Sequence, residues 1–139
     1  MDFRKIRALR GPNLWTKCTA LEAVVDIGEM KFPVREIPGF EARLREWLPG
    51  LHQGAAGPAG HKTEAAWGSL TLAHAIERVV AALLAQAGSP PAFSRTMATA
   101  ETSLFVVIVE YREEEVGRSA FDAARALIEA AIHDRPVPS

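Results

Sequence analysis

Residues 103–111 read Ser-Leu-Phe-Val-Val-Ile-Val-Glu-Tyr, a run of β-branched and aromatic side chains with almost no polar interruption. Such residues favour strands, and a strand that is apolar on both faces is typical of the interior of a sheet. We therefore expect this segment to be a central strand. Residues 93–99 precede it and predict a second strand.

Apolar residues elsewhere in the chain follow two different periods. They alternate with polar residues between positions 19 and 27, as in a half-buried strand, and residues 3–9 predict a further strand. Spacings of three and four residues predict helices over residues 40–48, 71–87 and 115–133. This order of elements favours an α+β fold. We expect a two-layer sandwich, in which a mostly antiparallel sheet of about four strands is covered on one face by about three helices.

The length of the chain fits one domain spanning residues 1–139. Within it, residues 53–64 are rich in small side chains and predict a flexible internal loop, and residues 134–139 predict a tail.

Charge and cysteine content exclude several classes of protein. Sixteen Lys and Arg against 17 Asp and Glu give a net charge of −1, which lacks the basic field of a general nucleic-acid binder. No apolar run approaches the ~20 residues that span a bilayer, so no membrane partner is expected. The single Cys18 can form neither an internal disulfide nor a thiolate cluster for zinc, which favours a cytoplasmic location.

A corner is predicted within residues 7–15, Arg-Ala-Leu-Arg-Gly-Pro-Asn-Leu-Trp, directly after the first strand. Gly11 permits unusual backbone angles, and Pro12 fixes φ and removes a backbone donor. Asn13 can form a hydrogen bond within its own turn. Core packing alone does not require these residue types in this order.

Three stretches together carry a resemblance to a known family. They are residues 7–15, the sequence Ile-Pro-Gly-Phe at 37–40, and Phe-Ser-Arg-Thr at 93–96 together with residues 106–118. Over residues 4–132 the chain resembles the amino-terminal domain of cyanophycin synthetase, the ligase that polymerises aspartate and arginine. The resemblance implies a parent enzyme in which this domain precedes an ATP-grasp module and a Mur-ligase-like module. The chain has no G-x-x-x-x-G-K-[ST] loop, so we expect no cofactor here, with ATP and Mg²⁺ in the other modules.

The sequence His74-Ala75-Ile76-Glu77-Arg78 departs from a zinc-binding motif, H-x-x-E-H, at its last position. Some cyanophycin synthetases carry the complete motif, and their amino-terminal domain resembles a metallopeptidase that cuts the polymer into primers. Here a guanidinium, which offers no lone pair to zinc, replaces the second histidine. Glu110 is the type of residue that could complete such a site. We expect no bound metal and no catalytic residue, with Glu77 and Arg78 pairing on the solvent side of the helix.

A polymer with alternating carboxylates and guanidiniums needs a surface of both signs. Arg10 and Arg95 stand beside turn-forming motifs and are candidates for polymer binding, together with His74 and Glu77. The acidic run 113–115 could also contribute, or it could mark a helix start, where glutamates favour the helix dipole.

Three functions remain open from the sequence. The first is a non-catalytic domain that binds and anchors the Asp-Arg polymer (cyanophycin) and supports assembly, including contacts in a homo-oligomer. The second is a degenerate zinc metallopeptidase acting on the same polymer to make primers. The third is a free-standing small binding domain. The residue at position 78 separates the first two, since the peptidase needs a metal ligand there.

Overall fold

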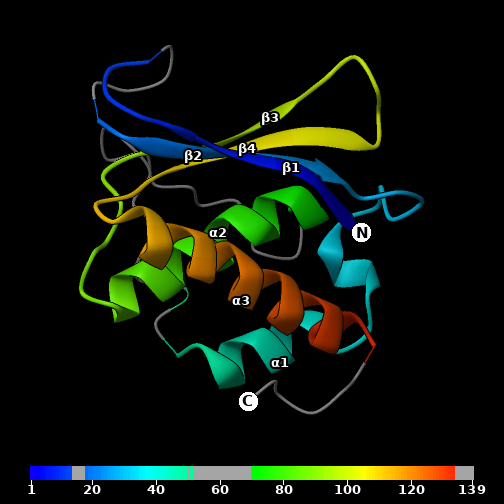
Figure 1. Ribbon diagram of the computed structural model, residues 1–139. Coiled ribbons are helices and arrows are strands. Elements are labelled where there is room, and N and C mark those ends of the chain that lie inside the picture. The colour runs from blue at the N-terminus through cyan, green and yellow to red at the C-terminus, as the bar shows by residue number, and fades with distance from the viewer. Residues whose placement is uncertain (14–17, 50, 52–69, 134–139) are drawn as a thin grey trace.

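The computed structural model describes residues 1–13, 18–49, 51 and 70–133 (Figure 1). The predicted loop 53–64 and tail 134–139 lie outside these residues. Every predicted strand and helix is confirmed, with each end within one residue of its expected position. The elements in chain order are β1 (Asp2–Leu9), β2 (Ala20–Asp26), a short 3-10 helix η1 (Val34–Glu36), α1 (Phe40–Trp47), α2 (Leu72–Gln86), β3 (Ser94–Ala98), β4 (Leu104–Glu110) and α3 (Glu114–Ile132).

The strands form one sheet in the order β1-β2-β4-β3, and all three pairings are antiparallel. The apolar strand β4 lies between β2 and β3, as its composition predicts. Helices α2 and α3 cover one face of this sheet, whereas no described element covers the other (Figure 1). The predicted α+β fold, with four strands and three helices, is therefore confirmed. We call the uncovered side the open face.

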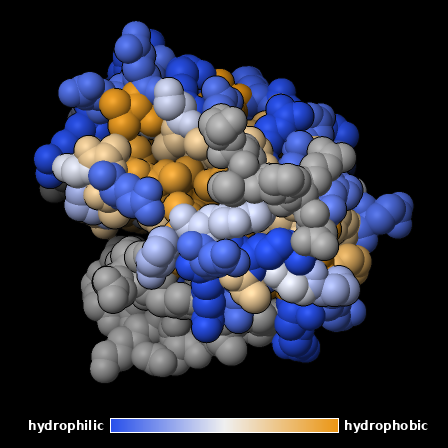
Figure 2. All heavy atoms as spheres, turned by 90° about the horizontal axis from the view of Figure 1, so that it is seen from below, coloured by the Kyte–Doolittle hydropathy of each residue, from blue (hydrophilic) through white to orange (hydrophobic). Residues whose placement is uncertain are grey.

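The three helices do not lie in a single layer. Helix α1 packs mainly against α3, on the side away from the sheet (Figure 1). Viewed from that side, hydrophobic side chains gather in one area bordered by hydrophilic ones (Figure 2). Within the described ranges, no helix has the length and apolarity needed to cross a membrane.

The hydrophobic core fills the space between the sheet and helices α2 and α3. Alternate residues of β2 and β4 point into it, because successive side chains of a strand face opposite sides of the sheet. Phe121 of α3 is fully buried and contacts Phe3 of β1 edge to face, with ring centroids 6.3 Å apart. The strand residues in the core include Leu21, Ala23, Val25, Val107 and Val109.

The sequence Ile-Pro-Gly-Phe sets the start of α1. Gly39 lies just before the helix with φ of +71°, in the left-handed region that glycine adopts most readily. This turn brings the Arg43 guanidinium to the carbonyl oxygens of Pro38, at 2.8 Å, and Ala131 in the last turn of α3, at 2.9 Å from Nε. The motif therefore joins α1 to the end of α3.

The corner after β1 closes as predicted. Gly11 has φ of +75°, and the side-chain amide of Asn13 donates to the carbonyl oxygens of Gly11, at 3.1 Å, and Cys18, at 3.0 Å. The second bond ties the start of the corner to the residues that enter β2. Trp15, which belongs to the same motif, lies outside the described residues.

Candidate functional site

The open face carries a row of side chains that crosses all four strands and is charged on three of them, the exception being Ile108 of β4. Arg7 of β1 is paired with Glu22 of β2, Glu22 with Ile108 of β4, and Ile108 with Arg95 of β3. Because these residues alternate along their strands with core residues, their side chains lie on the side away from the helices. The row therefore presents both signs of charge on one surface.

Two arginines of β1 form ion pairs with carboxylates of β2. Arg7 Nε lies 2.8 Å from Glu22, and an Arg4 nitrogen lies 2.7 Å from Asp26. The pKa of Asp26 is held below its ordinary value, first by the backbone N–H of Gly28 and also by the Arg4 guanidinium. Solvent screens exposed pairs of this kind, so they order the surface more than they stabilise the fold.

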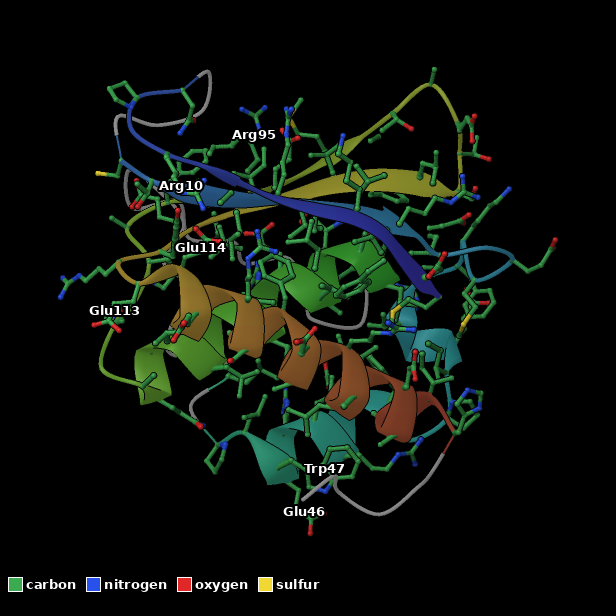
Figure 3. The ribbon with its side chains drawn as sticks, in the orientation of Figure 1. Arg10, Glu46, Trp47, Arg95, Glu113 and Glu114 are labelled. Atoms are coloured by element: carbon green, nitrogen blue, oxygen red, sulfur yellow. The ribbon has the colours of Figure 1, made fainter. Side chains whose placement is uncertain are left out.

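Arg10 lies near the end of β1 and turns toward the start of α3 (Figure 3). One of its nitrogens is 2.6 Å from Glu114, which also accepts from Arg118 at 2.9 Å. These contacts lower the pKa of Glu114, with the hydrogen bond from Arg118 first and that from Arg10 second. Glu114 and Glu115 occupy the first turn of α3, which confirms the interpretation of the acidic run as a helix start.

Arg95 differs from the other arginines of this surface. Its side chain is exposed and points away from the helices (Figure 3). It forms no hydrogen bond or ion pair with any residue in the ranges that the structure describes. Its five N–H donors are therefore available for a carboxylate of a ligand.

The Glu77 side chain of α2 lies against the face of the sheet that the helices cover, opposite the open face. Its two carboxylate oxygens accept hydrogen bonds from Ser94 Oγ and Thr96 Oγ1, each at 2.6 Å. Both hydroxyls lie on the side of β3 that faces the helices, since they alternate with Arg95. The expectation that Glu77 pairs on the solvent side of the helix is wrong, because these strand hydroxyls hold it between α2 and the sheet.

His74 lies one turn earlier on α2 and is also partly buried. Its Nδ1 is 2.7 Å from the hydroxyl oxygen of Thr71, the residue that caps α2, and its ring meets Phe105 edge to face. Burial lowers the pKa of His74, an effect that the nearby Glu77 carboxylate opposes and the Arg78 guanidinium adds to.

The four predicted polymer-binding residues therefore occupy three places. Arg95 is on the open face, Arg10 is at the junction of β1 and α3, and His74 and Glu77 lie between α2 and the sheet. Glu110 alternates with Val109 of the core, so its side chain projects from the side of the sheet opposite His74 and Glu77. It therefore does not join the degenerate motif. Within the described part of the chain, no group of three His, Cys, Asp or Glu residues is placed to hold a metal ion.

The position of His74 leads to a prediction for acid stability. Its folded-state pKa lies below the unfolded value of about 6.5, so the unfolded chain binds the proton more tightly and stability falls as pH drops through that value. We expect urea denaturation to show this loss between about pH 7 and pH 5, and His74→Gln to reduce it. Asp26 and Glu114 have lowered pKa values and titrate below this window.

His133→Gln is the matched control, because His133 is exposed at the end of α3. It should keep the dependence of the wild type between these pH values. An unchanged pH dependence in His74→Gln would contradict the assignment of the acid loss to this side chain.

The ion pairs on the open face are not predicted by the sequence. Arg4, Arg7, Glu22 and Asp26 are charged residues within two expected strands, and nothing in either segment names their partners. The period-two alternation places each strand's charges on one side, but pairing between strands depends on register, which the sequence of a single strand does not specify.

The fold and this surface together define a class: a small α+β unit with one core, whose uncovered sheet face presents charges of both signs. The chain belongs to the cyanophycin synthase-like N-terminal domain family, whose model matches residues 22–133. The resemblance drawn from the corner, Ile-Pro-Gly-Phe and residues 106–118 is therefore confirmed.

The matching relatives are much longer proteins. The cyanophycin synthetases of Trichormus variabilis and Nostoc sp. are each 33% identical over 138 residues, which cover 95% of this chain and 15% of the relative. That of Crocosphaera subtropica is 32% identical over 143 residues, covering 99% of this chain and 16% of the relative. The chain thus spans less than a fifth of the length of these relatives.

Proposed function

We propose that this domain binds and anchors the Asp-Arg polymer within a cyanophycin synthetase and takes no part in bond formation itself. In this proposal the other modules of the parent enzyme, of the ATP-grasp and Mur-ligase-like types, use ATP and Mg²⁺ to extend the polymer. The domain holds the growing chain close to them and supports assembly of the enzyme. The family membership supports the choice of polymer, since the longer relatives are named as its synthetases.

The observation that carries the proposal is the charged row on the open face. Arg95 offers an exposed guanidinium on the same face as the ion pair of Arg7 and Glu22, two strands away from Glu22 across Ile108 of β4. A polymer of alternating carboxylates and guanidiniums can place its carboxylates on the arginines and its guanidiniums on Glu22. Arg10 adds an exposed guanidinium beside this surface, at the junction of β1 and α3. His74 and Glu77 lie outside the surface, because they are partly buried between α2 and the sheet.

The weakness of exposed ion pairs determines how this surface binds. Each contributes only about 0–1 kcal/mol and is screened by salt, so one Asp-Arg unit is held loosely. An oligomer that reaches several pairs at once gains from each additional contact. Affinity is therefore expected to rise with oligomer length and to fall with salt concentration.

Calorimetric titration of the chain with Asp-Arg oligomers of increasing length tests this function. Arg95→Ala should weaken binding of the longer oligomers by up to about fivefold, and Arg10→Ala with Arg95→Ala should weaken it further. Arg45→Ala removes the same charge from α1, on the far side of the molecule, and should leave binding unchanged. Absence of binding at low salt, or an unchanged affinity in the double variant, would refute the proposal.

A further inference from the structure

A pocket of about 420 Å³ lies at the end of the sheet, where β2 begins and β4 ends. Its walls come from Cys18 and Thr19 before β2, from Glu110 and Arg112 around the end of β4, and from the segment 89–92 that precedes β3. Pockets of this volume accept ligands from amino-acid to drug size.

The pocket combines a buried carboxylate, that of Glu110, with an exposed guanidinium, that of Arg112. Glu110 is only 9% exposed, and it is the buried charged residue among those the structure describes. A carboxylate has about four acceptor positions, so it can bind a ligand donor in addition to partners within the protein. Arg112, two residues further on, is exposed and carries the opposite charge. Pro90 and Pro91 add apolar surface to its walls.

Glu110 also connects the pocket to the open face. It lies two residues after Ile108, the partner of Arg95, and therefore projects from the same side of the sheet. Residues related in this way on neighbouring strands are within reach of long side chains. A ligand bound at Glu110 can consequently extend toward Arg95.

We infer that this pocket binds a guanidinium carried on a short aliphatic chain, with Glu110 as its acceptor and Arg112 contacting a carboxylate of the same ligand. This inference rests on the proposed function and adds a specific subsite to it. Charge-assisted hydrogen bonds from a guanidinium to a carboxylate out of water are among the strong ones, and the planar donor suits bidentate contact. The ligand is either free arginine or an arginine side chain of the polymer.

The single cysteine supplies a direct readout. Cys18 is the only cysteine of the chain, is exposed and lines the pocket, so alkylation by iodoacetamide reports on its occupancy. We expect arginine or an Asp-Arg dipeptide to slow this reaction, and citrulline, which has the same shape without the charge, to bind at least about tenfold more weakly. Protection by arginine alone assigns the pocket to the free amino acid. Protection by the dipeptide alone assigns it to the polymer.

Glu110→Gln should weaken ligand binding at least about tenfold in calorimetry, whereas Glu113→Gln, at an exposed neighbouring carboxylate, should not. If Glu110→Gln fails to fold, Ala92→Trp replaces it, because Ala92 is an exposed pocket residue and a larger side chain there fills the space. Unaltered ligand binding in whichever variant folds, or no protection by either ligand, would overturn the inference. Those results would not affect length-dependent binding of oligomers through Arg95, which tests the proposed function. Conversely, if oligomers do not bind through Arg95, the titration with arginine still tests the pocket.

Discussion

Replacing Gly39 with alanine is expected to lower the free energy of unfolding by about 2.5–5 kcal/mol, from two separate effects. The left-handed φ of +71° costs a residue with a Cβ about 1–2 kcal/mol. In addition, that Cβ would fall on the guanidinium of Arg43, which must then move from the carbonyl oxygens of Pro38 and Ala131. Loss of hydrogen bonds to a charged group costs about 1.5–3 kcal/mol.

Gly28→Ala separates these effects. Gly28 has φ of +59°, but nothing lies within 4 Å of the position that its Cβ would take. It should therefore show only the backbone cost, and urea denaturation should find it clearly less damaging than Gly39→Ala. In an Arg43→Met background the additional cost at Gly39 should disappear, because the displaced hydrogen bonds are already absent. Equal effects of the two glycine substitutions would contradict this explanation of the Ile-Pro-Gly-Phe motif.

Gly117→Val is expected to lower the free energy of unfolding by about 2–4 kcal/mol through overpacking between α3 and the sheet. Even a Cβ at this position would lie 2.8 Å from Leu21 Cδ1 and 3.1 Å from Tyr111 Cβ. Leu21 is 1% exposed, so its side chain has no open space into which to move. The small gain in helix propensity over glycine, less than about 1 kcal/mol, does not offset the clash.

Ser119→Val controls for the new side chain itself. Ser119 is exposed on the same helix, two residues away, and the change should alter stability by no more than about 0.5 kcal/mol. Thermal or urea denaturation of the pair measures the difference. Similar stabilities of the two variants would show that α3 can move away from β2 without cost, contrary to the close contact at Gly117.

Local chemistry accounts for the parts of the structure that the sequence predicted well. The corner needs only Gly11, Pro12 and Asn13, whose preferences act within a few residues, and the hydrogen bond of Asn13 to Gly11 within the turn is as expected. The strands and helices follow from hydrophobic period. Hydrophobic period does not identify the partner of a helix, as α1 shows. The sequence predicts the apolar side of α1, but it does not predict that α3 covers this side instead of the sheet.

The candidate site was less predictable, because each side chain depends on a distant partner. Arg10 meets Glu114, which lies 104 residues later in the chain. Helical periodicity separates polar from apolar residues and therefore predicts a solvent-facing Glu77. It does not identify hydroxyl partners on a strand, such as those of Ser94 and Thr96. Arg95 points to the open face because Ser94 and Thr96 on either side of it point to the helices. A register shift of one residue would exchange the faces to which these three side chains point.

The central claim is that the open face binds the polymer, and an NMR titration of the isotopically labelled chain with an Asp-Arg oligomer at low salt tests it most directly. Binding there should perturb the side-chain Nε–Hε signals of Arg7 and Arg95 and the backbone amides along β3 and β4 (Figure 1). The amides of α1, on the far side of the molecule, should remain unchanged. Perturbations confined to the helices, with the signals of Arg7 and Arg95 unmoved, would contradict the claim.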